Sequence, residues 1–503
     1  MNRAALEPVS SAAPRADQQL PFAFAQMHGV LADTSATQLR IVHRPGLSVH
    51  VLAELGRVLG PHFDLVPVSE SEFRQRLSAA FARDNSVALQ VAEDLGADVN
   101  LARLADEIPA TGAELMEGED SAPVIKLINA LISQAVRERA SDIHIETYED
   151  KLSVRFRRDG VLSEVLAPKR LLAPLLVSRI KVMARLDIAE KRLPQDGRIG
   201  VKLAGHALDI RVSTLPSAHG ERVVLRLLDK QAGQMELDQL RMPPHVLEAY
   251  RSALKAPHGI ILVTGPTGSG KTTTLYAGLT HINDGHKNIL TIEDPVEYTL
   301  PGIGQTQVNA KIGMTFAQGL RSILRQDPDV VMLGEIRDTE TARIAVQASL
   351  TGHLVLSTLH TNTAVGAITR LQDMGIEPFL LASSLVAVLS QRLVRLLCVH
   401  CRQPHIPDAA ERRLLGLSDG DDVTIYEGQG CPACKHSGFN NRKGIFECVH
   451  VDAGMRTLIH DNAGEEALLA AARAQGPSLQ QDGIRCVLAG ETTLAEVLRV
   501  SAA

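Results

Sequence analysis

Tryptophan is absent from this chain of 503 residues, and aromatic side chains make up only 3% of it. Proteins that hold single-stranded nucleic acid combine a basic groove with aromatic stacking platforms, whereas the net charge here is −6. Cysteine is also scarce, since six residues are too few for a disulfide framework in so long a chain. We therefore expect no nucleic-acid partner and a cysteine chemistry other than disulfide bonding.

Long hydrophobic runs are also missing. The longest strongly apolar, uncharged stretch in the C-terminal half is 378–391, which is too short to cross a bilayer. Near the start, Glu7 and Asp17 interrupt any secretory pattern. The sequence therefore predicts a soluble cytosolic protein, with any membrane association arising through a partner.

Changes in composition divide the chain into modules, and the length suggests about three domains. Residues 1–92 contain a small α/β domain, and the acidic, Pro- and Gly-broken stretch 93–122 is predicted to be a linker. Residues 123–239 have helical spacing followed by strand patterns, which indicates a second α/β domain. A third begins at 240 and extends to 503.

The most specific motif is GPTGSGKT, which directly follows the apolar strand pattern 260–263. It matches G-x-x-x-x-G-K-[ST], a loop whose glycines allow its backbone N–H groups to wrap the phosphates of a nucleotide. Lys271 is expected to reach the β- and γ-phosphates of ATP, and the Thr272 hydroxyl to bind Mg²⁺. The predicted nucleotide-binding residues are Gly265, Pro266, Thr267, Gly268, Ser269, Gly270, Lys271 and Thr272.

Hydrolysis also needs an acid that positions the attacking water. The segment 327–335 (DPDVVMLGE) ends an apolar strand with Glu335, and Gly334 stands where the metal-side Asp of such strands is usual. We predict that Glu335 is the general base or water-orienting residue. A solvated acid capping a strand is the simpler alternative, and Arg337 just downstream argues against it.

Two further segments bring polar groups to strand ends. Glu293, Asp294 and Glu297 follow one strand, and they would face the nucleotide and position metal and water if that strand lies beside the strand of the phosphate loop. Glu293 is the predicted catalytic residue of the three. His353 precedes and His360 follows the strand pattern of 354–359. A lone histidine is more often structural, but we expect His360 to sense the γ-phosphate, with His353 a weaker candidate.

Four of the cysteines form two C-x-x-C pairs, separated by 29 residues. Four thiolates in this arrangement predict a tetrahedral, structural Zn²⁺ site with no position open to substrate. The wide separation requires the intervening segment to form an excursion of its own. The predicted ligands are Cys398, Cys401, Cys431 and Cys434, whereas Cys448 and Cys486 are expected to be ordinary buried thiols.

Together these segments resemble the secretion ATPase family. GPTGSGKTTTLY, TIEDPVEY, LRSILRQDPDVVMLGEIRD and TGHLVLSTLHTN are similar to its Walker A, Asp, Walker B and His boxes. ASDIHIE, LPQDGRI and RVSTLPSAHGERVVLRLL resemble the domain that precedes its ATPase core, and LPFAFAQMHGVL is most similar to the type II branch, the GspE family. The resemblance covers about residues 20 to 500.

The resemblance implies an α/β chain whose RecA-like P-loop core (240–503) carries a tetracysteine zinc insertion at 395–440, preceded by a PAS-like α/β domain and a small N-terminal α/β domain. It further implies a homo-hexamer that uses ATP hydrolysis to power pseudopilus assembly. The N-terminal domain would bind the cytoplasmic domain of a GspL-like platform protein. Arginines of the second domain would reach the nucleotide, and by motif position these are Arg211 and Arg226, with Arg198 a weaker candidate.

Three alternatives remain at this point. A type IV pilus assembly ATPase would share the same core and tetracysteine motif, which retraction-type pilus ATPases lack. A nucleic-acid motor on a RecA-like core would need the basic, aromatic surface that is scarce here. A nucleotide-regulated scaffold would bind ATP without turnover.

Overall fold

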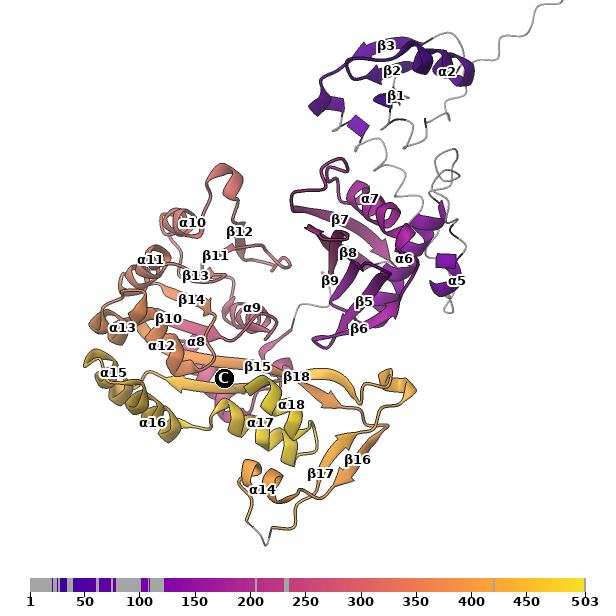
Figure 1. The fold of residues 1–503 in the computed structure, drawn as a ribbon. Helices are drawn as coiled ribbons and strands as arrows, with labels where there is room; N and C mark the ends of the chain where they lie inside the picture. The colour runs from indigo at the N-terminus through magenta and orange to yellow at the C-terminus, as the bar shows by residue number, and fades with distance from the viewer. Residues whose placement is uncertain are drawn as a thin grey trace, which may run out of the picture. The chain divides into compact units, whose positions relative to one another are not determined.

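The computed structural model describes residues 28–33, 39–59, 63–73, 101–106, 122–203, 206–229, 235–418 and 421–501, with a few isolated residues between them. The chain divides into two units, Met1–Asp229 and Lys230–Ala503, which are taken separately below (Figure 1). Most of the predicted linker at 93–122 lies outside the described residues, although helix α5 (Leu101–Asp106) belongs to it.

The first unit begins with a small three-stranded sheet in the order β1-β2-β3. Strand β1 (Val30–Asp33) runs antiparallel to β2 (Arg40–His43), and β2 runs parallel to β3 (Asp64–Pro67). Helix α2 (Val49–Leu59) follows β2, and its Val51 and Leu55, one turn apart, are buried in a common core with β1 and β2.

The rest of the first unit is built on a six-stranded antiparallel sheet in the order β6-β5-β4-β9-β8-β7. Its strands are β4 (Asp142–Thr147), β5 (Leu152–Arg158), β6 (Val161–Leu166), β7 (Gln195–Leu203), β8 (His206–Ser217) and β9 (Gly220–Asp229). Alternate residues of β4 face one core, in which Ile143 and Ile145 are buried with residues of α6 (Ala122–Arg137) and α7 (Ala173–Met183). Because of this alternation, Asp142, His144 and Glu146 share the other face.

The second unit contains a seven-stranded sheet in the order β12-β11-β13-β14-β10-β15-β18. Adjacent strands of this sheet run parallel to each other, except that β15 and β18 are antiparallel. Its strands are β10 (Gly259–Thr264), β11 (Ile289–Glu293), β12 (Gly304–Gln307), β13 (Val330–Leu333), β14 (Leu354–Leu359), β15 (Leu385–Leu397) and β18 (Phe439–His450).

Helices cover both faces of this sheet, so its parallel strands are apolar on both sides. In β10, Ile260 and Leu262 are buried in one core, and Ile261 and Val263 in the other. The first core includes residues of α10 (Phe316–Ile323), α11 (Thr339–Leu350), α12 (Ala364–Asp373), α13 (Pro378–Ser384), α15 (Ala453–His460) and α16 (Glu465–Gln475). The second includes α8 (Pro244–Leu254) and α9 (Lys271–Ile282).

Strands β15 and β18 form a long antiparallel hairpin, in which Ala387 pairs with His450 and Leu397 with Phe439. The segment between the two strands contains β16 (Arg402–His405), α14 (Ala409–Leu415) and β17 (Ile425–Gly428) and forms a separate lobe (Figure 1). Helices α17 (Leu479–Leu488) and α18 (Leu494–Ser501) pack against β15.

Candidate active site and metal centre

The phosphate loop leaves the carboxyl end of β10, between neighbours β14 and β15. Gly265, Gly268 and Gly270 have φ angles of 147°, 80° and 88°, the conformations that the sequence predicts for them. A Cβ at Gly265 would lie 2.4 Å from the carbonyl oxygen of Gln391, so a larger residue does not fit there. Helix α9 begins at Lys271, which directs its N-terminus at the loop.

Lys271 is folded back onto the loop, and its Nζ donates to the carbonyl oxygens of Gly265 (2.7 Å) and Pro266 (3.0 Å). Burial lowers the pKa of Lys271 to about 8; the charge of Glu335 opposes this shift and that of Arg392 adds to it. The ammonium group therefore lies within electrostatic reach of both residues.

Glu335 and His360 follow the carboxyl ends of the adjacent strands β13 and β14. His360 Nε2 lies 3.3 Å from Glu335 Oε2, and the Arg337 guanidinium donates to Glu335 Oε1. Burial alone would raise the pKa of Glu335, but Arg337 and, to a smaller degree, His360 hold it below its ordinary value. Burial and the charge of Lys271 lower the pKa of His360. The structure thus brings Lys271, Glu335 and His360 together.

Gly334, which precedes Glu335, lies against strand β11. A Cβ at this position would lie 3.4 Å from the Cα of Glu293 and 3.5 Å from the carbonyl oxygen of Ile292. The Gly334 carbonyl also accepts a hydrogen bond from Thr358 Oγ1 (2.7 Å). A Cβ at Gly334 would therefore be in ordinary van der Waals contact with β11.

The condition under which the acids near Glu293 would face the nucleotide, a strand directly beside β10, is not met. Strand β11 lies three places from β10, because β13 and β14 intervene. Glu293, 2% exposed, accepts hydrogen bonds from Tyr276, Thr291 (2.5 Å) and Gln305 (3.1 Å). Burial raises its pKa. The Glu293 carboxylate is thus packed between β11 and α9. Strand β11 is not a neighbour of β10, so this strand order does not place Glu293, Asp294 and Glu297 directly beside the phosphate loop.

His353 lies at the opposite edge of the sheet from the phosphate loop. It precedes β14, which runs parallel to β10, so it is at the amino ends of these strands. Its Nδ1 lies 2.9 Å from the carbonyl oxygen of Ala348 and 3.2 Å from Thr351 Oγ1. These contacts give His353 a structural role at the end of α11.

The arginines of the second domain stand in one row across five strands. Arg157, Asp142, Arg226, Arg211 and Arg198 are successive cross-strand partners from β5 to β7, and such partners share one face of a sheet. Asp142 pairs with Arg226 (3.0 Å) and more loosely with Arg157 (3.6 Å). This face is opposite the helices, and the Arg226 side chain remains 54% exposed.

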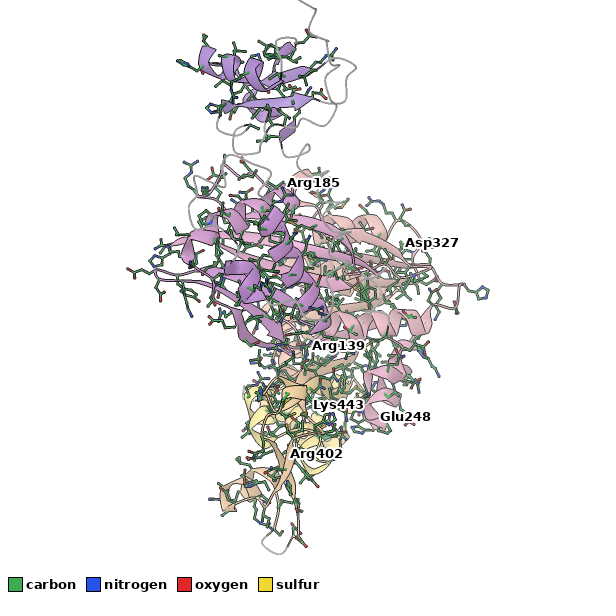
Figure 2. All side chains as sticks on the ribbon, turned by 90° about the vertical axis from the view of Figure 1, so that its right-hand side faces the viewer. Arg139, Arg185, Glu248, Asp327, Arg402 and Lys443 are labelled. Atoms are coloured by element: carbon green, nitrogen blue, oxygen red, sulfur yellow. The ribbon has the colours of Figure 1, made fainter. Side chains whose placement is uncertain are left out.

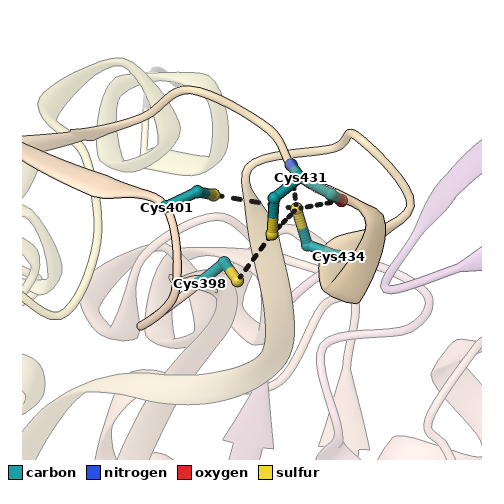
Figure 3. A group of neighbouring side chains, drawn as sticks. All are labelled: Cys398, Cys401, Cys431 and Cys434. Carbon is teal, nitrogen blue, oxygen red and sulfur yellow. Dashed lines mark hydrogen bonds between the residues drawn. The ribbon is translucent and has the colours of Figure 1, made fainter.

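The four predicted zinc ligands converge on one point (Figure 3). The Sγ atoms of Cys398 and Cys431 are 3.8 Å apart, as are those of Cys401 and Cys434, and Cys431 to Cys434 is 3.7 Å. Four sulfurs placed about 2.3 Å from a central Zn²⁺ would be separated by about 3.8 Å, so the spacing fits this ion.

Backbone N–H groups prepare one thiolate of this centre. Cys434 Sγ accepts from the amides of Cys431 (3.1 Å) and Gly438 (3.2 Å). Burial would raise the pKa of Cys434, but these hydrogen bonds outweigh it and lower the pKa to about 6. The centre lies next to β16, whose Arg402 guanidinium is 5.1 Å from the centre of the Tyr426 ring. Lys443 of β18 pairs with Glu491 (2.7 Å). Arg402 and Lys443 are labelled in Figure 2.

Sequence reasoning missed several polar residues around the phosphate loop. Gln391 is 3% exposed and accepts a hydrogen bond from Thr274 of α9 (2.6 Å), and Arg392 donates to Asn362 (2.8 Å). Tyr276 and Gln305 bind Glu293. The one available signal was the polar pair Gln391–Arg392 within the otherwise apolar strand pattern of β15.

Comparison with known proteins places this site in a family. Residues 117–499 match the model described as type II/IV secretion system protein, and residues 19–81 match the model of an N-terminal domain of GSPII protein E. The chain belongs to the type II/IV secretion system protein family. Two members of its type II branch are similar over nearly their whole length. "Type II secretion system protein E" of Pseudomonas aeruginosa is 59% identical (97% of this chain, 98% of the relative), and "Type II secretion system ATPase E" of Vibrio cholerae is 55% identical (98% of each).

Solved structures support the fold expected of a type II/IV secretion system protein. The Legionella pneumophila ATPase DotB matches with a TM-score of 0.56 and 20% identity, over 75% of this chain and 95% of DotB. The pilus retraction motor PilT with bound ADP matches with a TM-score of 0.50 and 26% identity, over 74% of this chain and 96% of PilT. The predicted α/β ATPase fold is confirmed. Among the described residues, no helix has the length and apolar character needed to cross a membrane.

Proposed function

We propose that this chain hydrolyses ATP to drive pseudopilus assembly and protein export by a type II secretion system, as a hexamer on the cytoplasmic side of the inner membrane. The observation that carries the proposal is the meeting of Lys271, Glu335 and His360 at one sheet edge in a chain similar to type II secretion proteins throughout. The match of residues 19–81 to a domain of GSPII protein E favours secretion over type IV pilus assembly.

The phosphate loop would bind the triphosphate through its backbone N–H groups and the N-terminus of α9. Lys271, which now donates to Gly265 and Pro266, would transfer its hydrogen bonds to the β- and γ-phosphates. Thr272 would hold Mg²⁺ through its hydroxyl, and the ion would neutralise charge on the phosphates.

Glu335 would orient a water molecule for attack on the γ-phosphorus and accept its proton, while the bond from that phosphorus to the ADP oxygen breaks. Its lowered pKa keeps the carboxylate ionised at neutral pH, as a proton acceptor must be. His360, whose Nε2 lies 3.3 Å from Glu335, would contact the γ-phosphate and so link its presence to the position of that carboxylate. Glu293 would act as a positioning residue, because the hydrogen bond that it accepts from Tyr276 joins the end of β11 to α9.

Positive charge from the second domain would complete the site. Arg211 and Arg226 belong to the arginine row, in which Arg211 is partly buried and the Arg226 side chain is 54% exposed. Arg226 retains donors beyond the one that binds Asp142. An arginine brought to the γ-phosphate stabilises charge that develops during phosphoryl transfer. This requirement would make hydrolysis depend on assembly of the ring.

The remaining parts would serve structure and docking. Cys398, Cys401, Cys431 and Cys434 would hold a structural Zn²⁺, because four thiolates leave no coordination position for substrate. The N-terminal domain would bind the cytoplasmic domain of the GspL-like platform protein and so bring the ATPase to the membrane.

ATPase activity measured against protein concentration tests the proposal. We expect specific activity to rise steeply as hexamers form, and to rise further when the cytoplasmic platform domain is added. A pull-down on that immobilised domain should retain the full chain. Stimulation by single-stranded DNA, or hydrolysis absent at every concentration, would contradict the proposal.

A further inference from the structure

The carboxyl end of β10 is bridged by a side chain that the proposed mechanism does not use. Strands β14 and β15 flank β10 on either side, and Thr264, the last residue of β10, pairs with Ser390. Arg392 lies two residues beyond Ser390, on the same face of β15. Its Nη2 donates to Oδ1 of Asn362, in the loop that follows β14, over a distance of 2.8 Å. The guanidinium therefore spans the strand end from which the phosphate loop departs.

The loop that Arg392 reaches is itself fixed to this strand end. Thr264 Oγ1 accepts a hydrogen bond from the Thr361 amide (3.0 Å), and Ser390 Oγ donates to the carbonyl oxygen of Asn362 (3.4 Å). Asn362, two residues after His360, is thus fixed at the strand end from which the phosphate loop departs. Its side chain in turn holds the Arg392 guanidinium in place.

Arg392 carries a charge for which the described residues offer no counter-ion. The residue is only 9% exposed, no described carboxylate pairs with it, and its buried Nε lacks a hydrogen-bond acceptor among the described residues. By contrast, Arg395 on the same strand pairs with the buried Glu496 (2.7 Å). Burying a guanidinium without an anion costs stability, and the pKa of Arg392 is lowered by burial as this predicts.

A bound polyanion would supply the missing counter-charge. Lys271 of the phosphate loop lies within electrostatic reach of Arg392. We infer that Arg392 is a phosphate-site cation of the nucleotide-binding subunit itself, held by Asn362 and compensated by the phosphates of bound nucleotide. This inference rests on the proposed function and adds a binding residue to it. It differs from the arginine row of the second domain, because Arg392 belongs to the same sheet as the loop.

If the inference holds, replacing Arg392 should weaken nucleotide binding without weakening the fold. Replacing an arginine with a purely structural role would destabilise the fold instead. In the nucleotide-free chain, Arg392→Gln should leave the melting temperature unchanged or raise it, because it removes an uncompensated buried charge. Affinity for fluorescent ADP should fall by about tenfold or more, the usual effect of losing one hydrogen bond to a charged group. Arg392→Lys, which keeps the charge, should recover part of that loss.

Arg473→Gln is the matched control, because Arg473 is partly buried in the same unit and pairs with the buried Glu447. It should lower the melting temperature and leave ADP affinity unchanged. Asn362→Ala should weaken ADP binding in the wild-type background, with no further loss when combined with Arg392→Gln. Sedimentation should show that all the variants keep the wild-type oligomeric state.

Two results would overturn the inference. One is an unchanged ADP affinity in Arg392→Gln, and the other is a melting temperature that falls as it does in Arg473→Gln, failure to fold included. A wild-type chain that binds no ADP would instead contradict the proposed function, so the two failures are distinguishable.

Discussion

His360 and Glu335 lie on adjacent strand ends, with the imidazole Nε2 3.3 Å from the carboxylate Oε2. Glu335→Gln would keep the shape of this contact but remove the proton acceptor. We expect ATP hydrolysis to fall by about 100-fold or more, the usual loss for a general base, while nucleotide binding is retained. Phosphate release and fluorescent-nucleotide titration measure the two effects. The exposed Glu466→Gln is a control that should hydrolyse normally, and unchanged turnover in Glu335→Gln would remove Glu335 from the mechanism.

Lys271 should make nucleotide affinity depend on pH. Its pKa is lowered to about 8 in the nucleotide-free chain, and phosphates would raise it again. Above pH 8 the free chain therefore holds a neutral Lys271 that must take up a proton on binding. We expect ADP affinity to fall as pH rises from about 8, by up to tenfold per pH unit. Calorimetry in buffers of different ionisation enthalpy should detect the proton uptake, and its absence near pH 8.5 would contradict this prediction.

The arginine row should govern turnover rather than the stability of the sheet. Because Arg226 is half-exposed, Arg226→Ala should cost little stability, whereas hydrolysis should fall on the order of 100-fold if the residue reaches the nucleotide. Arg211→Ala should behave similarly. Arg158→Ala is the control, because Arg158 pairs with Glu138 and, next to Arg157 on β5, belongs to the opposite face. Equal turnover in all three variants at matched hexamer concentration would disprove the role.

The cysteine centre should contain one Zn²⁺ per chain and contribute its binding free energy to folding. Loss of several kcal/mol in Cys431→Ser should lower the melting temperature of the second unit by about 10 °C. Elemental analysis and calorimetry measure both quantities. Cys448→Ala, outside the centre, should keep the metal, whereas freshly purified wild-type protein without zinc would contradict the assignment.

The buried network around Glu293 should be sensitive to single atoms. Tyr276→Phe removes one hydroxyl that donates to Glu293 and accepts from the Glu297 amide (3.4 Å). Leaving a buried carboxylate short of a donor costs about 1–3 kcal/mol, which chemical denaturation should detect. Tyr298→Phe is matched in size but should cost less, because the Tyr298 ring only packs edge-on against Tyr276. Equal costs would show that the hydroxyl contact is not needed.

The sequence predicted what depends on local patterns. The phosphate loop is recognised by its glycine spacing, and Glu335 by the apolar run that precedes it. The C-x-x-C pairs are recognised as candidate metal ligands by their spacing alone. The order of the strands could not be predicted, because β13 and β14 insert between β10 and β11 through non-local pairing. For that reason the surroundings of Glu293 were expected at the wrong place. Arg392 was missed because its importance depends on Asn362, which is 30 residues away and aligned only by the sheet.

The register of β15 and β18 lets the cysteine-bearing lobe leave and re-enter the sheet at adjacent positions. The lobe leaves the sheet at Leu397 and returns at Phe439, and these two residues are directly paired. Paired residues of antiparallel strands have Cα atoms only about 5 Å apart, a gap that a short turn can close. The strand pairing of the sheet therefore does not depend on the length of this segment, whereas the core beneath α17 and α18 does, because Leu415 and Ile425 are buried in it.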